Sequence, residues 1–219
     1  MRILVYGDSN SWGTLADGSN MRHPRRWPRV MAEALGDGYE VVEDCLPGRT
    51  TAHDDPEMGG ATFNGLAHLE ASLLAQAPLD LVLIMLGTND MKARFEPTAE
   101  RISGNIARLA EHVSASLAGP GVWREGASPQ VGIIVPPPLP ENANDPDWDR
   151  VDEWAGGRDA SLALAQAVDM RCADIPRLDA APFAHGSHRD PIHFEPEIHE
   201  HLGAAVADWV RRAFSEQPA

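Results

Sequence analysis

Hydrophobic residues recur along this chain in two patterns, as short continuous runs and as longer stretches with helical spacing. The short runs, which predict strands, are residues 2–6, 39–45, 79–86, 130–136 and, more weakly, 176–179. The runs at 79–86 and 130–136 are nearly continuous in Leu, Ile and Val, which is typical of parallel strands covered on both faces. The pattern therefore predicts a central parallel sheet.

The longer stretches place apolar residues three or four positions apart, which is typical of helices with one buried face. They predict helices at 27–36, 61–77, 97–119 and about 195–214, and one more that carries Leu162 to Val168. Strands that alternate with helices indicate right-handed crossovers and an α/β fold with a doubly wound sheet. Because the sequence shows no internal repeat or linker, we expect one domain over residues 1–219.

Charge and composition narrow the classes of partner. The chain has 18 Lys and Arg against 33 Asp and Glu, a net charge of −15, which argues against nucleic acid or an anionic membrane as a partner. Its apolar runs are shorter than the ~18 residues that span a bilayer, and the first residues show no signal peptide, so a cytoplasmic protein is expected. Cys45 and Cys172 are interpreted as small buried residues rather than as a disulfide.

Small and polar residues follow three of the predicted strands. They are the segments GDSN at 7–10, LPGRTT at 46–51 and GTND at 87–90. In a doubly wound sheet, ligands bind beyond the carboxyl ends of the strands, so the three segments are expected at one edge. Ser9 there needs a base to become a nucleophile, and DPIH at 190–193 supplies Asp190 and His193 after the fifth strand. We expect the three side chains to meet as nucleophile, orienting carboxylate and base.

A tetrahedral oxyanion at Ser9 would need hydrogen-bond donors nearby. The N–H groups of Ser9 and Gly48 and the side-chain amide of Asn89 are the candidates. Each segment alone has a simpler interpretation: a helix N-cap for Ser9, a turn for GTND and a capped helix start for DPIH. The conjunction of four segments at one sheet edge favours catalysis.

Taken together and in this order, the four segments resemble the four sequence blocks of the SGNH (GDSL-type) hydrolase family, from residue 7 to residue 193. The resemblance implies a flavodoxin-like three-layer α/β/α sandwich around a five-stranded parallel sheet. It also implies Ser9 as nucleophile, His193 as base, Asp190 as orienting residue, and Ser9, Gly48 and Asn89 as oxyanion donors.

More narrowly, LPGRTT, LVLIMLGTNDMK and VPPPL are similar to the arylesterase and acyltransferase (perhydrolase) branch of that family, although Asn10 stands where many members carry Leu. This implies a serine esterase for small acyl or aryl esters that forms an acyl-enzyme and needs no cofactor. Water, an alcohol or peroxide would accept the acyl group. An acetyl esterase for carbohydrates is the alternative within the family. A non-catalytic binding module is disfavoured, since every catalytic position is filled.

The small-molecule ester would contact apolar side chains near these segments, although core packing is the alternative for each aromatic residue. The candidates are Trp12, Ile192, Phe194, Trp148 and Trp154, with Phe183 nearby. The long irregular stretch 137–157 could limit the acyl chain or form a contact in a homo-oligomer.

Two further possibilities stay open at this point. Arg49 would meet either an anionic substrate group or a surface carboxylate. The spacing of His185, His188, Asp190 and His193 is compatible with a metal. However, the pairing with Ser9 explains Asp190 and His193 better, so no metal is expected.

Overall fold

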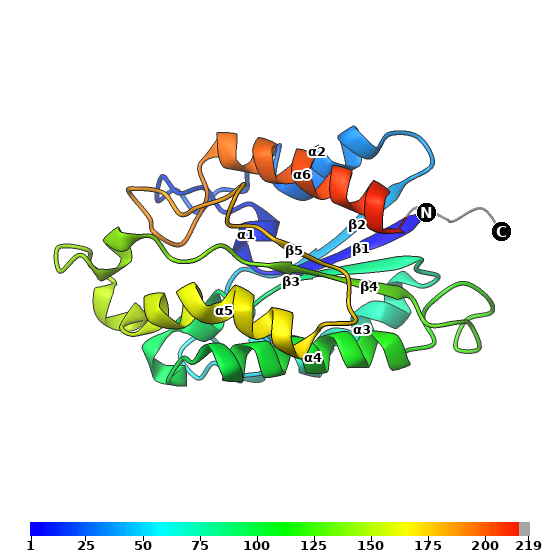
Figure 1. The fold of residues 1–219 in the computed structure, drawn as a ribbon, viewed down its shortest axis with the longest axis horizontal. Coiled ribbons are helices and arrows are strands. Elements are labelled where there is room, and N and C mark those ends of the chain that lie inside the picture. Colours follow the sequence, from blue (N-terminus) through cyan, green and yellow to red (C-terminus); the bar gives the residue numbers. More distant parts are fainter. Residues whose placement is uncertain (215–219) are drawn as a thin grey trace.

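Five parallel strands form one sheet in the computed structural model, which describes residues 1–214, and their order is β2-β1-β3-β4-β5 (Figure 1). The strands are β1 (Arg2–Gly7), β2 (Glu40–Cys45), β3 (Leu81–Met85), β4 (Gln130–Val135) and β5 (Arg177–Asp179). All five predicted strands are confirmed, with small shifts at their ends. The chain leaves β1 toward β2 on one side and returns to β3 on the other, so the switch point lies between β1 and β3.

Helices cover both faces of the sheet, which confirms the three-layer prediction (Figure 1). The first face is covered by α2 (Trp27–Leu35) and α6 (Pro196–Phe214), and the second by α3 (Gly65–Gln76), α4 (Ala99–Ala115) and α5 (Gly157–Arg171). The helix predicted at 61–77 begins only at Gly65. Residues 61–63 form the 3-10 turn η1 (Ala61–Phe63), and the Asn64 side chain caps α3 by accepting the N–H of Ala67 at 3.2 Å.

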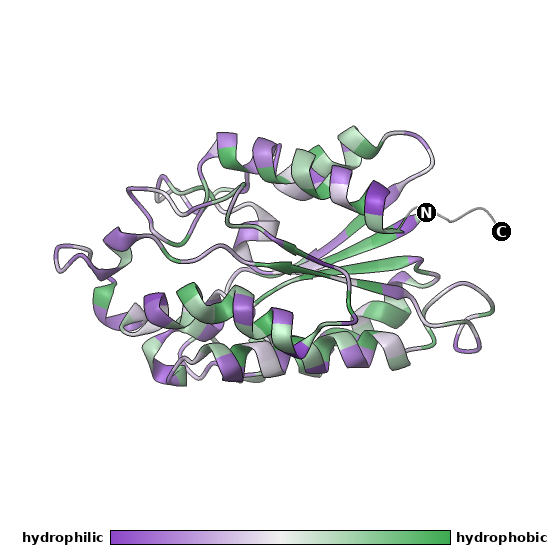
Figure 2. Ribbon diagram, in the orientation of Figure 1, coloured by the Kyte–Doolittle hydropathy of each residue, from purple (hydrophilic) through white to green (hydrophobic). Residues whose placement is uncertain are grey.

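Alternate residues of the central strands enter two separate hydrophobic cores. On β1, Ile3 and Val5 pack under α2 and α6, whereas Leu4 and Tyr6 pack against the opposite helices. Because both faces are covered, nearly every position of β1 and β3 is apolar, and the strands stand out as hydrophobic in Figure 2. This explains why the strands appear in the sequence as continuous runs.

Short elements occupy the loops around the carboxyl ends of the strands. They are α1 (Ser9–Trp12), η2 (Asn89–Met91), η3 (Ala93–Phe95), η4 (Glu141–Asn144) and η5 (Val151–Trp154). The stretch 137–157 is therefore organised by two 3-10 turns. Among the helices of residues 1–214, none has the length and apolar character needed to cross a membrane. Cys45 is half-buried and Cys172 buried, and both are free thiols.

Candidate active site

Three side chains from opposite ends of the chain meet at the carboxyl end of β1. The Nε2 atom of His193 lies 3.1 Å from Oγ of Ser9, and its Nδ1 atom lies 2.6 Å from Oδ2 of Asp190. Each ring nitrogen of His193 thus faces one of the two partners that the sequence suggests. A hydroxyl, an imidazole and a carboxylate in this series are the elements of acyl-transfer catalysis by serine.

The start of α1 fixes Ser9. Asp8, rather than Ser9, is the N-cap residue, and its carboxylate accepts the N–H of Asn10 at 3.0 Å. The Ser9 hydroxyl is therefore left for His193, and its N–H is in the first turn, where a helix offers no internal acceptor. Burial raises the pKa of Asp8 to about 6, although the hydrogen bond from Asn10 opposes this shift.

The Asp190 carboxylate contacts both the backbone of its own turn and the imidazole of His193. One of its carboxylate oxygens accepts the N–H of Ile192 at 2.9 Å, and the other faces His193. Burial alone would raise the pKa of Asp190, but the hydrogen bond and charge of His193 hold that pKa below its ordinary value. An ionised carboxylate in this position orients the ring and stabilises its protonated form.

The candidate oxyanion donors lie in the loops after β2 and β3. Gly48 has a φ of +88°, a backbone conformation that favours glycine. A Cβ atom there would also lie 2.5 Å from Cε of Met58, so the flexible end of that side chain would have to move. The side-chain amide of Asn89 donates to the carbonyl oxygen of Arg49 at 3.2 Å, which places it beside the Gly48 turn. Both groups border the same pocket as Ser9.

Arg49 forms a salt bridge, which was one of its two sequence interpretations, but its side chain is buried rather than at the surface. Its side chain is buried, donates to the carbonyl and the carboxylate of Asp44 at 2.5 and 2.7 Å, and lies 4.1 Å from the ring centre of Tyr6. Arg49 therefore anchors the turn that carries Gly48 to Asp44 in β2.

Asp90 connects the loop after β3 to the loop after β2. Its buried carboxylate accepts the N–H of Thr51 at 2.9 Å and also the Thr51 hydroxyl. Burial raises the pKa of Asp90 to about 7, with the hydrogen bonds from Thr51 acting in the opposite direction. Sequence reasoning used Asn89 from the GTND segment and overlooked its neighbour, which links the segments that carry Gly48 and Asn89.

A pocket of about 340 Å³ opens beside Ser9 and His193. Its lining residues are Ser9, Trp12, Thr14, Asn20, Pro47, Gly48, Met58, Asn89, Lys92, Arg150, Trp154, Ile192 and His193. Three of the five predicted substrate-binding residues, Trp12, Trp154 and Ile192, are among them. Each also supplies an apolar wall next to the reacting groups.

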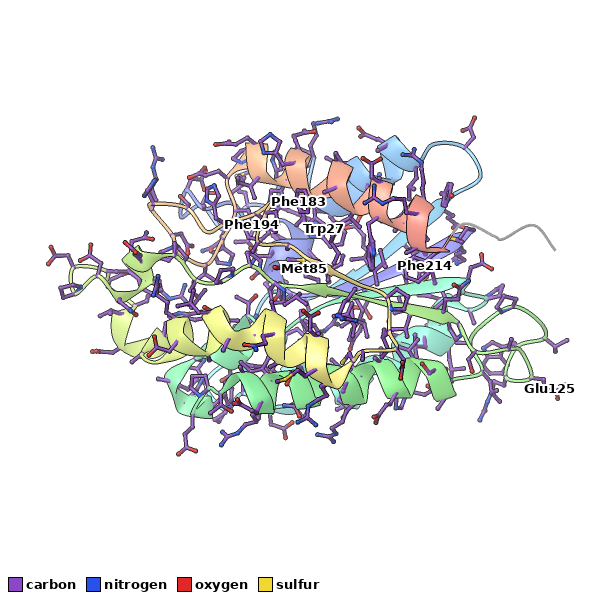
Figure 3. All side chains as sticks on the ribbon, in the orientation of Figure 1. Trp27, Met85, Glu125, Phe183, Phe194 and Phe214 are labelled. Carbon is purple, nitrogen blue, oxygen red and sulfur yellow. The ribbon has the colours of Figure 1, made fainter. Side chains whose placement is uncertain are left out.

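The other two, Phe194 and Trp148, are corrected by the structure, because neither lines this pocket. The chain turns at His193, so that Ile192 enters the core under α3 to α5 and Phe194 enters the core under α2 and α6. Figure 3 shows Phe194 near Trp27 on that side, where it is fully buried. Trp148 packs partly buried against the first of these cores. Phe183 does not line the pocket either.

The sequence did not predict several of the pocket residues, because they belong to no recognisable motif. Thr14, Asn20 and Met58 come from irregular loops, and Arg150 from the 137–157 stretch. Lys92 is the exception, since it lies only two residues after GTND. It is almost fully buried, and its Nζ lies 3.2 Å from a carboxylate oxygen of Asp55.

His185, His188, Asp190 and His193 do not gather into a metal site. Within residues 1–214, no three His, Cys, Asp or Glu side chains gather closely enough to hold a metal ion. Both ring nitrogens of His193 are already directed at Ser9 and Asp190.

The sequence profile of the GDSL-like lipase/acylhydrolase family matches residues 5–201, a span that contains the whole site. The chain belongs to this family. The SGNH (GDSL-type) resemblance is thereby confirmed.

Relatives in the family share both sequence and fold. An arylesterase from Vibrio mimicus is 31% identical over 134 residues, which are 60% of this chain and 58% of that protein. The structure of a carbohydrate acetylesterase from Sinorhizobium meliloti superimposes with a TM-score of 0.87 at 34% identity, over 97% of this chain and 99% of that one. The native aryl esterase of M. smegmatis gives 0.86 at 36% identity, over 96% and 98%. The chain is thus similar over nearly its full length to solved family members.

Proposed function

We propose that this GDSL-family protein is a serine esterase that cleaves small acyl or aryl carboxylic esters through an acyl-enzyme. The observation that carries the proposal is the pair of distances at His193, 3.1 Å to the Ser9 hydroxyl and 2.6 Å to the Asp190 carboxylate. Membership of the GDSL-like lipase/acylhydrolase family and the similarity to aryl and acetyl esterases support it.

In the first half of the reaction, His193 accepts the Ser9 proton while Oγ attacks the ester carbonyl carbon. The negative charge moves to the carbonyl oxygen, which the N–H groups of Ser9 and Gly48 and the amide of Asn89 stabilise. Asp190 stabilises the imidazolium. The carbon–oxygen bond to the alcohol then breaks, and the alcohol leaves with the proton from His193.

In the second half, His193 removes a proton from water as the water oxygen attacks the acyl-enzyme. The bond to Oγ breaks, Ser9 regains its proton from His193, and the carboxylic acid leaves. An alcohol or peroxide in place of water gives acyl transfer, so the acyltransferase activity is the same reaction with another acceptor.

The shape of the pocket supports a small ester. At about 340 Å³ it lies near the lower end of the range for ligand pockets, roughly 300 to 1,000 Å³. Trp12, Trp154 and Ile192 offer apolar contacts to an aryl or short acyl group.

A carbohydrate acetyl ester is the second candidate within the same chemistry. The polar side chains of Thr14 and Asn20 at the pocket and the similarity to the Sinorhizobium meliloti acetylesterase favour it. Rates on phenyl acetate and on acetylated xylose separate the two, since a large preference for the sugar ester would demote the aryl ester.

Labelling by a fluorophosphonate tests the nucleophile. We expect the wild type and Ser11→Ala to label, because Ser11 lies buried in the same short helix but its hydroxyl forms no hydrogen bond with His193 or any other described residue. Ser9→Ala should not label while it keeps the circular dichroism of the wild type. Equal labelling of Ser9→Ala would refute the assignment, and an unlabelled but folded wild type would indicate a binding module. A single domain, self-association and a cytoplasmic location stay predictions.

A further inference from the structure

The pocket beside Ser9 carries positive charge in a strongly acidic protein. The chain has 33 Asp and Glu and a net charge of −15. The side chains of Lys92 and Arg150 bring positive charge to the pocket lining, and no carboxylate from residues 1–214 lines it. A pocket that has cationic side chains in its lining, and no carboxylate from the described residues, favours a substrate that bears negative charge.

Lys92 is the less available of the two cations. Its Nζ lies 3.2 Å from Asp55 and 3.1 Å from the sulfur of Met58, and its side chain is only 1% exposed. Burial lowers the pKa of Lys92, against the attraction of Asp55. Its charge is therefore largely matched by a carboxylate behind the pocket wall.

Arg150 is more available. Its Nε donates to Glu153 at 2.9 Å, whereas its two terminal nitrogens donate no hydrogen bond within residues 1–214, and 39% of the side chain is exposed. The Glu153 carboxylate is shared among three cations, because Arg94 and Lys92 also lie 3.5 and 3.9 Å from it. Its negative charge is therefore only partly available to Arg150. Two N–H-bearing nitrogens thus remain for a ligand.

Aromatic rings hold the Arg150 guanidinium in place. Its central carbon lies 5.7 Å from the ring centre of Trp154 and 6.0 Å from that of Trp148. The contact gives Trp148 a role next to the pocket although it does not line it. A guanidinium held against aromatic rings loses less freedom when it binds a planar anion.

A second polar group at the pocket lacks a partner. The hydroxyl of Thr14 is buried, and the part of the chain that the structure describes supplies no hydrogen-bond partner for it. Thr14 lines the same pocket, and its residue is only 6% exposed. A ligand oxygen that accepts this hydroxyl would satisfy a group that is otherwise costly to bury.

We propose that Arg150 is a specificity-determining residue that binds a carboxylate substituent of the ester substrate. The inference rests on the proposed esterase function and narrows its substrates to esters with an anionic group on the acyl or alcohol side. Two terminal N–H groups of a guanidinium match the two oxygens of a carboxylate, which makes arginine better suited than lysine.

A matched pair of aryl acetates tests the proposal. 3-Acetoxybenzoate carries a carboxylate, and 3-acetoxybenzamide is a neutral substrate of almost the same shape. We expect the wild type to favour the benzoate in kcat/KM. Arg150→Gln should reduce the ratio of the two kcat/KM values about fivefold, the effect of one accessible ion pair. Arg150→Lys should keep part of the preference.

Two controls separate a bound carboxylate from a general charge effect. Arg212→Gln removes the same charge from an exposed position in the last turn of α6 and should leave the ratio as in the wild type. Raising the salt concentration to 0.5 M should weaken the preference of the wild type more than that of Arg150→Gln. A ratio that is the same in wild type and Arg150→Gln overturns the role of Arg150 while the esterase stands. If neither ester is cleaved, the esterase proposal fails and this inference with it.

Discussion

The middle of the sheet and its carboxyl edge are both buried, but they are built from opposite kinds of residue. At the middle, Leu4, Val82 and Leu83 are fully buried among apolar side chains. In the turns that follow these strands, Asp8 and Asp90 are buried to almost the same degree. Packing in the middle is not directional, whereas each polar group at the edge depends on a specific hydrogen bond.

The difference shows what positions the site. Both carboxylates have pKa values raised by burial, to about 6 for Asp8 and about 7 for Asp90, so keeping them ionised in the folded protein works against stability. In return, Asp8 fixes the start of the helix with Ser9, and Asp90 fixes Thr51 beside Asn89. The middle of the sheet should therefore dominate stability and the edge should dominate activity.

The largest expected effect is at the edge. His193→Ala removes the proposed base, and we expect kcat to fall by on the order of 10⁴-fold or more with KM little changed. Steady-state kinetics on a neutral aryl acetate, together with thermal unfolding, measures both properties. The control His201→Ala alters an exposed residue of α6 and should keep full activity. A small loss in His193→Ala would remove it from the reaction.

The opposite result is expected in the middle of the sheet. Leu83→Ala leaves a cavity between β3 and the α2/α6 layer and should lower the free energy of unfolding by about 2 to 5 kcal/mol. Below the unfolding transition, kcat should stay within a few-fold of the wild type. The same truncation at Leu162, which is 54% exposed, should change stability by less than about 0.5 kcal/mol. Urea denaturation measures both, and equal losses would contradict the comparison.

The next largest effect is expected at Asn89, a proposed oxyanion donor. Asn89→Ala should lower kcat about 10² to 10³-fold, because the developing charge loses one preorganised donor. The free energy of unfolding should fall much less in Asn89→Ala than in Leu83→Ala. Asn144→Ala, at an exposed position of η4, is the matched control. An unchanged kcat in Asn89→Ala would exclude its amide from the oxyanion site.

The sequence predicted the strands and the meeting of the edge segments for one physical reason. A strand buried on both faces, such as Leu81–Met85, needs an uninterrupted apolar run, and parallel strands must bring their carboxyl ends to one edge. Once the strands were located, Ser9, Asn89 and His193 had to lie near each other. The family resemblance added their roles, which the experiments above test.

The pocket walls could not be predicted in the same way. Trp148 and Trp154 lie in the same irregular stretch, yet of the two only Trp154, at the end of η5, lines the pocket. Arg49 looked like a surface residue, but Asp44 and Tyr6 enclose it. The positions of these side chains depend on contacts between loops that are distant in the sequence. The local spacing of hydrophobic and polar residues does not predict such contacts.

The smallest expected effect concerns the pH dependence of stability at the edge. The pKa of Asp90 is about 7 in the folded protein and near 3.8 when exposed, so between these values the folded state binds more protons than the unfolded state. Stability contributed by Asp90 is therefore lost as the pH rises through this range. Thr51, Asp8 and a ring nitrogen of His53 at 3.7 Å surround the carboxylate.

Asp90→Asn removes the contribution of Asp90 to the pH dependence of stability. Groups whose contributions have the opposite sign are present in both proteins. Among these, burial lowers the pKa of His199 to about 3. The difference in unfolding free energy between variant and wild type should shift in favour of the variant by about 1 kcal/mol for each pH unit between 5 and 6.5. Urea denaturation at several pH values measures the difference, with the exposed Asp174→Asn as the control. If the unfolding free energies of wild type and Asp90→Asn vary with pH in parallel, burial of the Asp90 carboxylate does not lower the stability of the protein. The contrast between the edge and the middle of the sheet would then rest on activity alone.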